Sequence, residues 1–264
     1  MGLVVETYAS IGVTRLSRWI FNCYLIHDGG DGRSVVVDAG LPSIVDDLFV
    51  AMSRLGLPPE NVGAVVATHG HSDHVGGAAA LARRLRCRVH LPSRTGGYLA
   101  GEDPRTPGPR AIARIWPALL DQPLDFTGLR GLAAGAQIAG YSNGRMRWRG
   151  DPPTADLIDG GPLPGAPAWK VLATPGHTDD SVAFYAESTR TLLSGDSVLC
   201  ARGMAWCTPE TVDDDLARAT NARLRALEVD HLLPGHGRPV SAPDLLATAI
   251  APTDRPGRLP TPGH

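Results

Sequence analysis

The chain has 264 residues, a net charge of −2 and four scattered cysteines without a CxxC pair. This length is ordinary for one large α/β enzyme, and the near-neutral charge provides no basic field that would attract nucleic acid. We find no apolar run of roughly 18 residues and no signal-peptide pattern, so we expect a cytoplasmic protein with reduced thiols and no membrane association.

The first part of the chain predicts a hairpin followed by a helix. Phe21 to His27 and Ser34 to Asp38 are apolar runs on either side of a glycine-rich turn, which is typical of two paired strands. From Ser43 to Leu55 the apolar residues fall on one helical face, with Ser43 expected as the N-cap.

The next part alternates strands and helices. Ala64 to Ala67 is wholly apolar, which indicates a strand covered on both faces. A helix is expected from Asp73 or His74 to about Leu85, and Arg88 to Leu91 predicts another strand. This order is typical of layered α/β folds.

Residues 94–155 differ from the rest because they are rich in proline, glycine and arginine. The segment is too long for a structureless loop inside a compact domain. We therefore predict an inserted, partly helical cap that forms a lid, with a disordered insertion as the alternative.

Strand patterns return after the insertion, within a single domain that we expect to cover 1–264. The expected elements are strands at Trp169 to Thr174, Val182 to Ala186, Arg190 to Ser194 and Asp230 to Leu233, helices at Val212 to Leu227 and Asp244 to Ile250, and a flexible tail over 252–264. In the first of these helices, Leu216, Leu224 and Leu227 are expected to point inward.

The central chemical signal is the run Thr68-His69-Gly70-His71-Ser72-Asp73-His74. Four potential metal ligands follow a buried strand directly, and the start of a helix can turn the last two toward the same point as the first two. Imidazole and carboxylate groups suit zinc, iron or manganese better than calcium or magnesium.

Three more candidate ligands occur much later in the chain, each just after a predicted strand. They are His177 in a Pro-Gly-His-Thr run, Asp196 in Ser-Gly-Asp and His236 in Gly-His-Gly. Because α/β sheets present their sites at the ends of strands, we expect all seven side chains to converge.

These motifs together resemble the metallo-β-lactamase-fold hydrolase superfamily, over about Asn22 to Leu246 outside the insertion. Val37-Asp38-Ala39-Gly40 also looks like the first motif of that family. The resemblance implies an α/β fold of the four-layer αββα sandwich type. It also implies a centre for two divalent metal ions, zinc first, with iron or manganese as alternatives.

The resemblance divides the ligands between two sites: His69, His71 and His177 for one ion, Asp73, His74 and His236 for the other, with Asp196 and a water or hydroxide bridging both. Asp73, which could relay a proton, and Asp196 are the implied catalytic residues. Asp38 would support a ligand histidine through a hydrogen bond, or would simply be a turn residue at a strand end.

The leading hypothesis is hydrolysis of an ester, thioester or lactone in a small molecule, as in the glyoxalase II and lactonase branches. Asp196 argues against a β-lactam substrate, since antibiotic-degrading zinc lactamases commonly have another residue there. Only 28 residues follow His236, so we expect no helical glutathione-binding domain. An anionic substrate could instead meet arginines of the insertion, although a solvated surface is the simpler reading: Arg94, Arg105, Arg110, Arg114, Arg145, Arg147 and Arg149.

Other functions stay open. A mononuclear iron oxygenase acting on persulfides would use His69, His177 and Asp196. A phosphodiesterase or ribonuclease is less favoured because the charge is near neutral, and a binding module without activity is a further alternative. Three tyrosines are possible oxyanion or leaving-group donors, with ordinary packing as the alternative: Tyr98, Tyr141 and Tyr185. The oligomeric state is not predicted.

Overall fold

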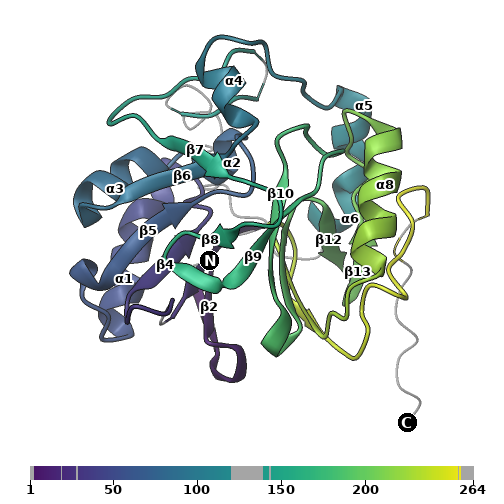
Figure 1. Cartoon of the computed structure of the whole chain (residues 1–264). Coiled ribbons are helices and arrows are strands. Elements are labelled where there is room, and N and C mark those ends of the chain that lie inside the picture. Colours follow the sequence, from purple (N-terminus) through teal and green to yellow (C-terminus); the bar gives the residue numbers. More distant parts are fainter. Residues whose placement is uncertain are drawn as a thin grey trace.

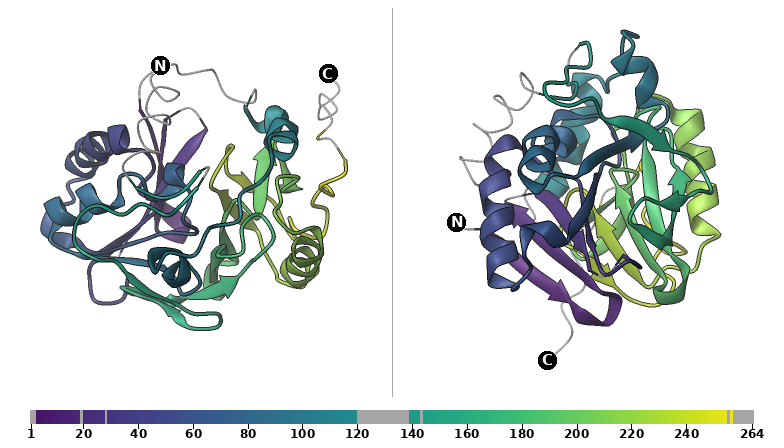
Figure 2. Two further views of the ribbon diagram at one scale, coloured as in Figure 1. Left: turned by 90° about the horizontal axis from the view of Figure 1, so that it is seen from above. Right: turned by 60° about the vertical axis from the view of Figure 1, so that its left-hand side comes forward.

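Two β-sheets pack face to face, with helices on both outer sides (Figure 1). This computed structural model describes residues 3–18, 20–27, 29–119, 139–142, 144–254 and 256. Figure 2 shows the same layers from two further directions, with the purple and blue N-terminal helices on one side and the green helix α8 on the other. The predicted four-layer αββα sandwich is confirmed.

In the described part of the chain, the first sheet has seven strands, which follow one another in chain order. They are β1 (Val4–Tyr8), β2 (Val13–Arg18), β3 (Phe21–Ile26), β4 (Ser34–Val37), β5 (Val62–Val66), β6 (Arg88–Pro92) and β7 (Thr154–Leu157). Strands β1 to β4 pair antiparallel, and β4 to β7 pair parallel. The predicted hairpin is therefore β3–β4.

The second sheet, as far as the described residues extend, has six strands in the order β15-β14-β11-β10-β9-β8. They are β8 (Pro162–Leu163), β9 (Ala166–Ala173), β10 (Val182–Ala186), β11 (Thr191–Gly195), β14 (His231–Pro234) and β15 (Val240–Ser241). Strand β11 pairs parallel with β14. A separate two-stranded ribbon consists of β12 (Val198–Ala201) and β13 (Met204–Cys207).

Short helices connect and cover the sheets. The α-helices are α1 (Val45–Arg54), α2 (Ser72–Val75), α3 (Ala78–Leu85), α4 (Thr95–Leu99), α5 (Pro109–Ile112), α6 (Trp116–Leu119) and α8 (Asp214–Arg225). The 3-10 turns are Ala9–Ile11, Pro42–Ile44, Pro59–Asn61, Ala113–Ile115 and Glu187–Thr189. In the described part of the chain, no helix combines the length and apolar character needed to cross a bilayer.

Alternating side chains of the first sheet enter two different cores. In β3, Leu25 belongs to the cluster that packs under α1 and α3, whereas Tyr24 belongs to the cluster between the sheets. Phe184 of β10 fills the same inter-sheet core and is fully buried. A strand covered on both faces must be apolar at every position, which explains the uninterrupted apolar run in β5.

The helix expected from Asp73 or His74 to Leu85 is interrupted. Helix α2 ends at Val75 because the Gly77 N–H donates to Gly40 O in the loop after β4, at 2.9 Å, and not back along the helix. A Cβ atom on Gly77 would lie 2.6 Å from Ala39 O, so only glycine permits this approach. The break separates α2 from α3 within the connection between β5 and β6.

Three further sequence predictions were wrong. Residues 244–248 form turns and Ile250 forms a bridge with Trp206, since Leu245 N and Ile250 N donate to Val229 O and Ala205 O in neighbouring segments. Leu216, expected inward, is 38% exposed, and α8 begins after an Asp213 cap. Ser43 does not cap α1, because a 3-10 turn precedes that helix.

The insertion, residues 94–155, begins with α4, α5 and α6 and returns to the first sheet as β7. Its residues 120–138 lie outside the described residues, as does most of the tail predicted over 252–264. The cap and the flexible tail therefore stay predictions.

Candidate metal centre

The seven predicted ligands lie at the carboxyl ends of four strands. Residues 68–74, the histidine loop, follow β5 of the first sheet, and their last three residues begin α2. From the second sheet, His177 follows β9, Asp196 follows β11 and His236 follows β14. The structure brings all seven side chains together.

Their ligand atoms form three overlapping groups, within each of which all atoms lie within 4.8 Å of one another. These groups are His69, His71 and His177; Asp73, His74 and His236; and His69, His74 and Asp196. The first two match the division expected from the sequence, and the third joins them.

Asp196 lies between the two outer groups. Its Oδ2 atom is 3.5 Å from Nε2 of His177 and 3.1 Å from Nε2 of His236. Its Oδ1 atom and the Nε2 atom of His74 are buried without a hydrogen-bond partner among the described residues. Buried polar atoms are rarely left unpaired, so these two atoms suit the coordination of a cation.

The outward nitrogens of several site histidines are already held by hydrogen bonds. His177 Nδ1 donates to Glu210 O at 2.8 Å, and His236 Nδ1 donates to Ile20 O at 3.1 Å. These bonds fix the ring tautomer, so each Nε2 lone pair points into the centre. Because the two acceptors are backbone carbonyls, sequence reasoning missed them.

Asp38 connects the first sheet to the histidine loop. One carboxylate oxygen accepts from Thr68 N at 2.8 Å, and the other accepts from Thr68 Oγ1 at 2.9 Å and from His74 Nδ1 at 2.9 Å. The residue adopts a positive φ of 55°, which aspartate tolerates better than most residues. Its position agrees with the supporting role expected from the sequence.

Buried histidines and carboxylates lie close together in the candidate metal centre and shift one another's pKa values. Burial alone lowers the pKa of His236, but the carboxylates of Asp196 and Asp73 overcome it and raise the pKa to about 10. Burial likewise raises the pKa of Asp196, but the nearby His236 and His74 outweigh burial and bring this pKa well below its ordinary value. Burial and the neighbouring His177 lower the pKa of His71 to about 3. Without an ion, the site therefore keeps protons on His236.

Five imidazoles and two carboxylates suit zinc, iron or manganese, and each of the three groups could hold a metal ion. The centre reaches solvent on one side. The Asp73 side chain is 18% exposed and His71 is half-buried, whereas His74 is almost fully enclosed. A substrate would therefore approach over Asp73 and His71.

The three tyrosines considered as oxyanion donors are committed to protein acceptors. Tyr141 OH donates to Asp180, Tyr98 OH to Asp179, and Tyr185 OH to Glu228 O. Ordinary packing thus accounts for all three hydroxyls. Asp180, which sequence reasoning also missed, carries no spacing signal that would mark it.

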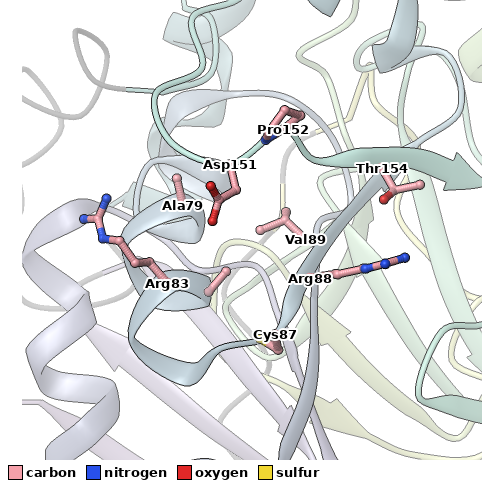
Figure 3. Close-up of a pocket in the computed structure, with 9 residues that line it drawn as sticks. Ala79, Arg83, Cys87, Arg88, Val89, Asp151, Pro152 and Thr154 are labelled. Carbon is pink, nitrogen blue, oxygen red and sulfur yellow. The ribbon is translucent and has the colours of Figure 1, made fainter.

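A separate hollow of about 330 Å³ lies between α3 and β6 (Figure 3). Asp151 reaches into it from the end of the insertion, while Arg83 and Arg88 extend in opposite directions. Its lining contains none of the seven candidate ligands. The chemistry therefore lies elsewhere, at the strand ends.

The metallo-beta-lactamase superfamily model matches residues 18–236. The chain belongs to this superfamily. The match confirms the family and the fold expected from the sequence motifs, and it supports an enzyme of the metallo-hydrolase type.

Among curated relatives, a probable metallo-hydrolase, YflN of Bacillus subtilis, is 26% identical over 259 residues, covering 88% of this chain and 86% of the relative. A hydroxyacylglutathione hydrolase of Rhodopseudomonas palustris is 26% identical over 182 residues, or 68% of this chain and 49% of the relative. The chain thus spans about half the length of that enzyme.

Among solved structures, TTHA1623 in a di-iron-bound form has a TM-score of 0.55 and 26% identity, covering 86% of this chain and 92% of that chain. The metallo-beta-lactamase family protein TTHA1429 from Thermus thermophilus has a TM-score of 0.55 and 25% identity. The match covers 93% of this chain and 76% of that chain. Both likenesses extend over most of the sandwich.

Proposed function

We propose that the chain is a binuclear metallo-hydrolase that cleaves an ester, thioester or lactone bond in a small molecule. The observation that carries this proposal is the pair of complete ligand groups that meet at Asp196. The proposed ligands of the first ion are His69, His71 and His177; those of the second are Asp73, His74 and His236; Asp196 bridges them.

Zinc is the proposed metal, with iron or manganese as alternatives for the same donors. The likeness to a structure solved in a di-iron-bound form supports two ions over one. Bound divalent ions of this kind lower the pKa of a coordinated water toward about 7 and polarise the bond under attack.

Two carboxylates of the protein have proposed roles in this reaction, one as a shared ligand and the other as a proton carrier. Asp196 faces His236 and His177 together, so its carboxylate would be the ligand that the two groups share. Asp73 lies on the solvent side, with its Oδ2 atom 3.3 Å from His236 Nε2, and can pass a proton outward. Asp73 and Asp196 are therefore the proposed catalytic residues.

The relatives and the surroundings of the site support the proposed substrate class. Similarity to a hydroxyacylglutathione hydrolase supports an acyl-type bond. Three insertion arginines are ion-paired within the protein: Arg94 with Asp179 and Glu102, Arg105 with Asp213, and Arg145 with Asp103. These arginines favour a surface role, so recognition of an anionic substrate would fall to other groups.

A mononuclear iron oxygenase would need only His69, His177 and Asp196. It would leave Asp73, His74 and His236 without a purpose, although the unpartnered Nε2 atom of His74 belongs to that group. The complete second group therefore favours the hydrolase.

The test combines metal analysis with a substrate panel. Protein purified without added metal should contain close to two equivalents of divalent metal and should hydrolyse lactones, thioesters or esters without consuming oxygen. One equivalent of iron with oxygen uptake on a persulfide would overturn the proposal, as would turnover of phosphodiesters alone.

A further inference from the structure

The end of the insertion forms part of the wall of the candidate metal centre. Tyr141 N donates to Gly70 O at 3.0 Å, and Ser72 N donates to Tyr141 O at 3.2 Å, so this segment runs parallel to the histidine loop for one rung. A Cβ atom on Gly140 would lie 2.7 Å from Gly70 O. The close approach therefore depends on glycine at position 140.

The Tyr141 side chain contacts a candidate ligand directly. Its ring meets the His71 ring edge to face, with centroids 4.9 Å apart, and it packs in the same way against Tyr98 at 5.3 Å. The tyrosine is 1% exposed. The His71 ring also meets the rings of His69 and His177, with centroids 4.7 and 5.0 Å away. The contact with Tyr141 closes a further side of the ring and so restricts the orientation of the imidazole.

Asp180 ties the same loop to both ends of the insertion. Its Oδ1 atom accepts from Tyr141 OH at 2.6 Å, and its Oδ2 atom accepts from Thr95 Oγ1 at 2.7 Å and from Gly70 N at 3.1 Å. The carboxylate is 1% exposed, so these three bonds replace its hydration. A side chain on Gly70 would clash with Tyr141.

We infer that Asp180 and Tyr141 are positioning residues that hold the His71 imidazole in its ligand orientation and so couple the insertion to one of the two metal sites. This inference rests on the proposed binuclear centre. Neither side chain touches a metal ion or the reacting atoms. Both act through the Gly70 backbone and the His71 ring, as supporting residues do in other metal sites.

The test measures zinc affinity by competition with a chromophoric chelator in the full-length chain. Tyr141→Phe and Asp180→Asn should lower the affinity for one of the two zinc ions by about 10- to 100-fold and leave the affinity for the other nearly unchanged. Tyr98→Phe is the matched control, because it removes a neighbouring tyrosine–carboxylate bond that does not reach the histidine loop. It should leave both affinities within about threefold of the wild type.

A second measurement separates positioning from general stability. The visible spectrum of bound Co²⁺ should change in Tyr141→Phe and Asp180→Asn but not in Tyr98→Phe, while thermal unfolding in chelator confirms that all three are folded. Unchanged affinities and spectra in both variants would overturn the inference, as would an equal loss in Tyr98→Phe. A wild-type chain that binds no zinc would instead overturn the proposed function.

Discussion

The Nδ1 atom of His74 lies 2.9 Å from the Oδ2 atom of Asp38, and both side chains are almost fully buried. The same carboxylate also accepts two hydrogen bonds from Thr68. One side chain at the end of β4 thus orients a candidate ligand and holds the entry to the histidine loop.

Replacing Asp38 with Asn should weaken metal binding at the site of His74. The amide keeps the size and the tolerance for positive φ, but it can present an N–H to His74 Nδ1 and favour the wrong ring tautomer. Zinc affinity should fall by about 10- to 100-fold. Asp46→Asn, on the exposed face of α1, is the control. Equal zinc affinities in the two variants would contradict the supporting role of Asp38.

Asp196→Ala should lose metal and nearly all hydrolysis while the chain stays folded. The substitution removes the carboxylate that faces His177 and His236 together. Metal content, turnover and near-UV circular dichroism measure the metal binding, the hydrolysis and the folding of this variant. Asp156→Ala is the matched control, because it removes a carboxylate hydrogen-bonded to His90 outside the centre. Retained metal and activity in Asp196→Ala would contradict the bridging role.

Gly235→Ala should expel metal by crowding two ligands. An added Cβ atom would lie 2.3 Å from Asp196 Oδ1 and 2.8 Å from His74 Cε1. Gly63→Ala in β5 is the control, since its Cβ atom would meet nothing closer than 3.4 Å. Zinc titrations of both variants test this steric argument, and full zinc binding by Gly235→Ala would refute it.

The metal-free protein should lose stability as the pH rises from about 6.5 to 9. The carboxylates of Asp196 and Asp73, together with His74, face His236, whose pKa is raised to about 10 against the ordinary 6.5 despite its burial. A raised pKa stabilises the folded state fully below the unfolded value, and this stability is lost as the pH rises toward the folded value.

Zinc should abolish this decline, because a bound ion takes the place of the proton. Melting temperatures with chelator and with zinc, measured across this pH range, provide the comparison. The depressed pKa values of Asp73 and Asp196 matter only at acidic pH. His236→Gln in chelator should flatten the slope; parallel curves with and without zinc would show that His236 exchanges no proton for the metal.

The candidate ligands could be predicted from the sequence because each is encoded locally. A short run after an apolar strand places His69 or His177 at a strand end, whatever the rest of the chain does. The sandwich then brings strand ends together, so local patterns were enough to predict that the seven side chains converge. Their division into two groups came from the family resemblance.

Apart from Asp38, the groups that hold the ligands could not be predicted in the same way. Glu210 and Ile20 contribute backbone carbonyls, which every residue has, and Asp180 acts through contacts with three distant segments. The helix predicted over 244–250 failed for a related reason. Its backbone N–H groups find partners in neighbouring segments, and tertiary hydrogen bonds of this kind override local periodicity.

Each outer group of candidate ligands draws members from both sheets. The first sheet supplies the histidine loop, while His177 and His236 come from the second. Neither half of the sandwich alone carries a full set of donors for either position. An ion bound there would have ligands from both sheets, so it would find its complete coordination only after the two halves have packed together. Because it would bind only the folded sandwich, it would stabilise that state.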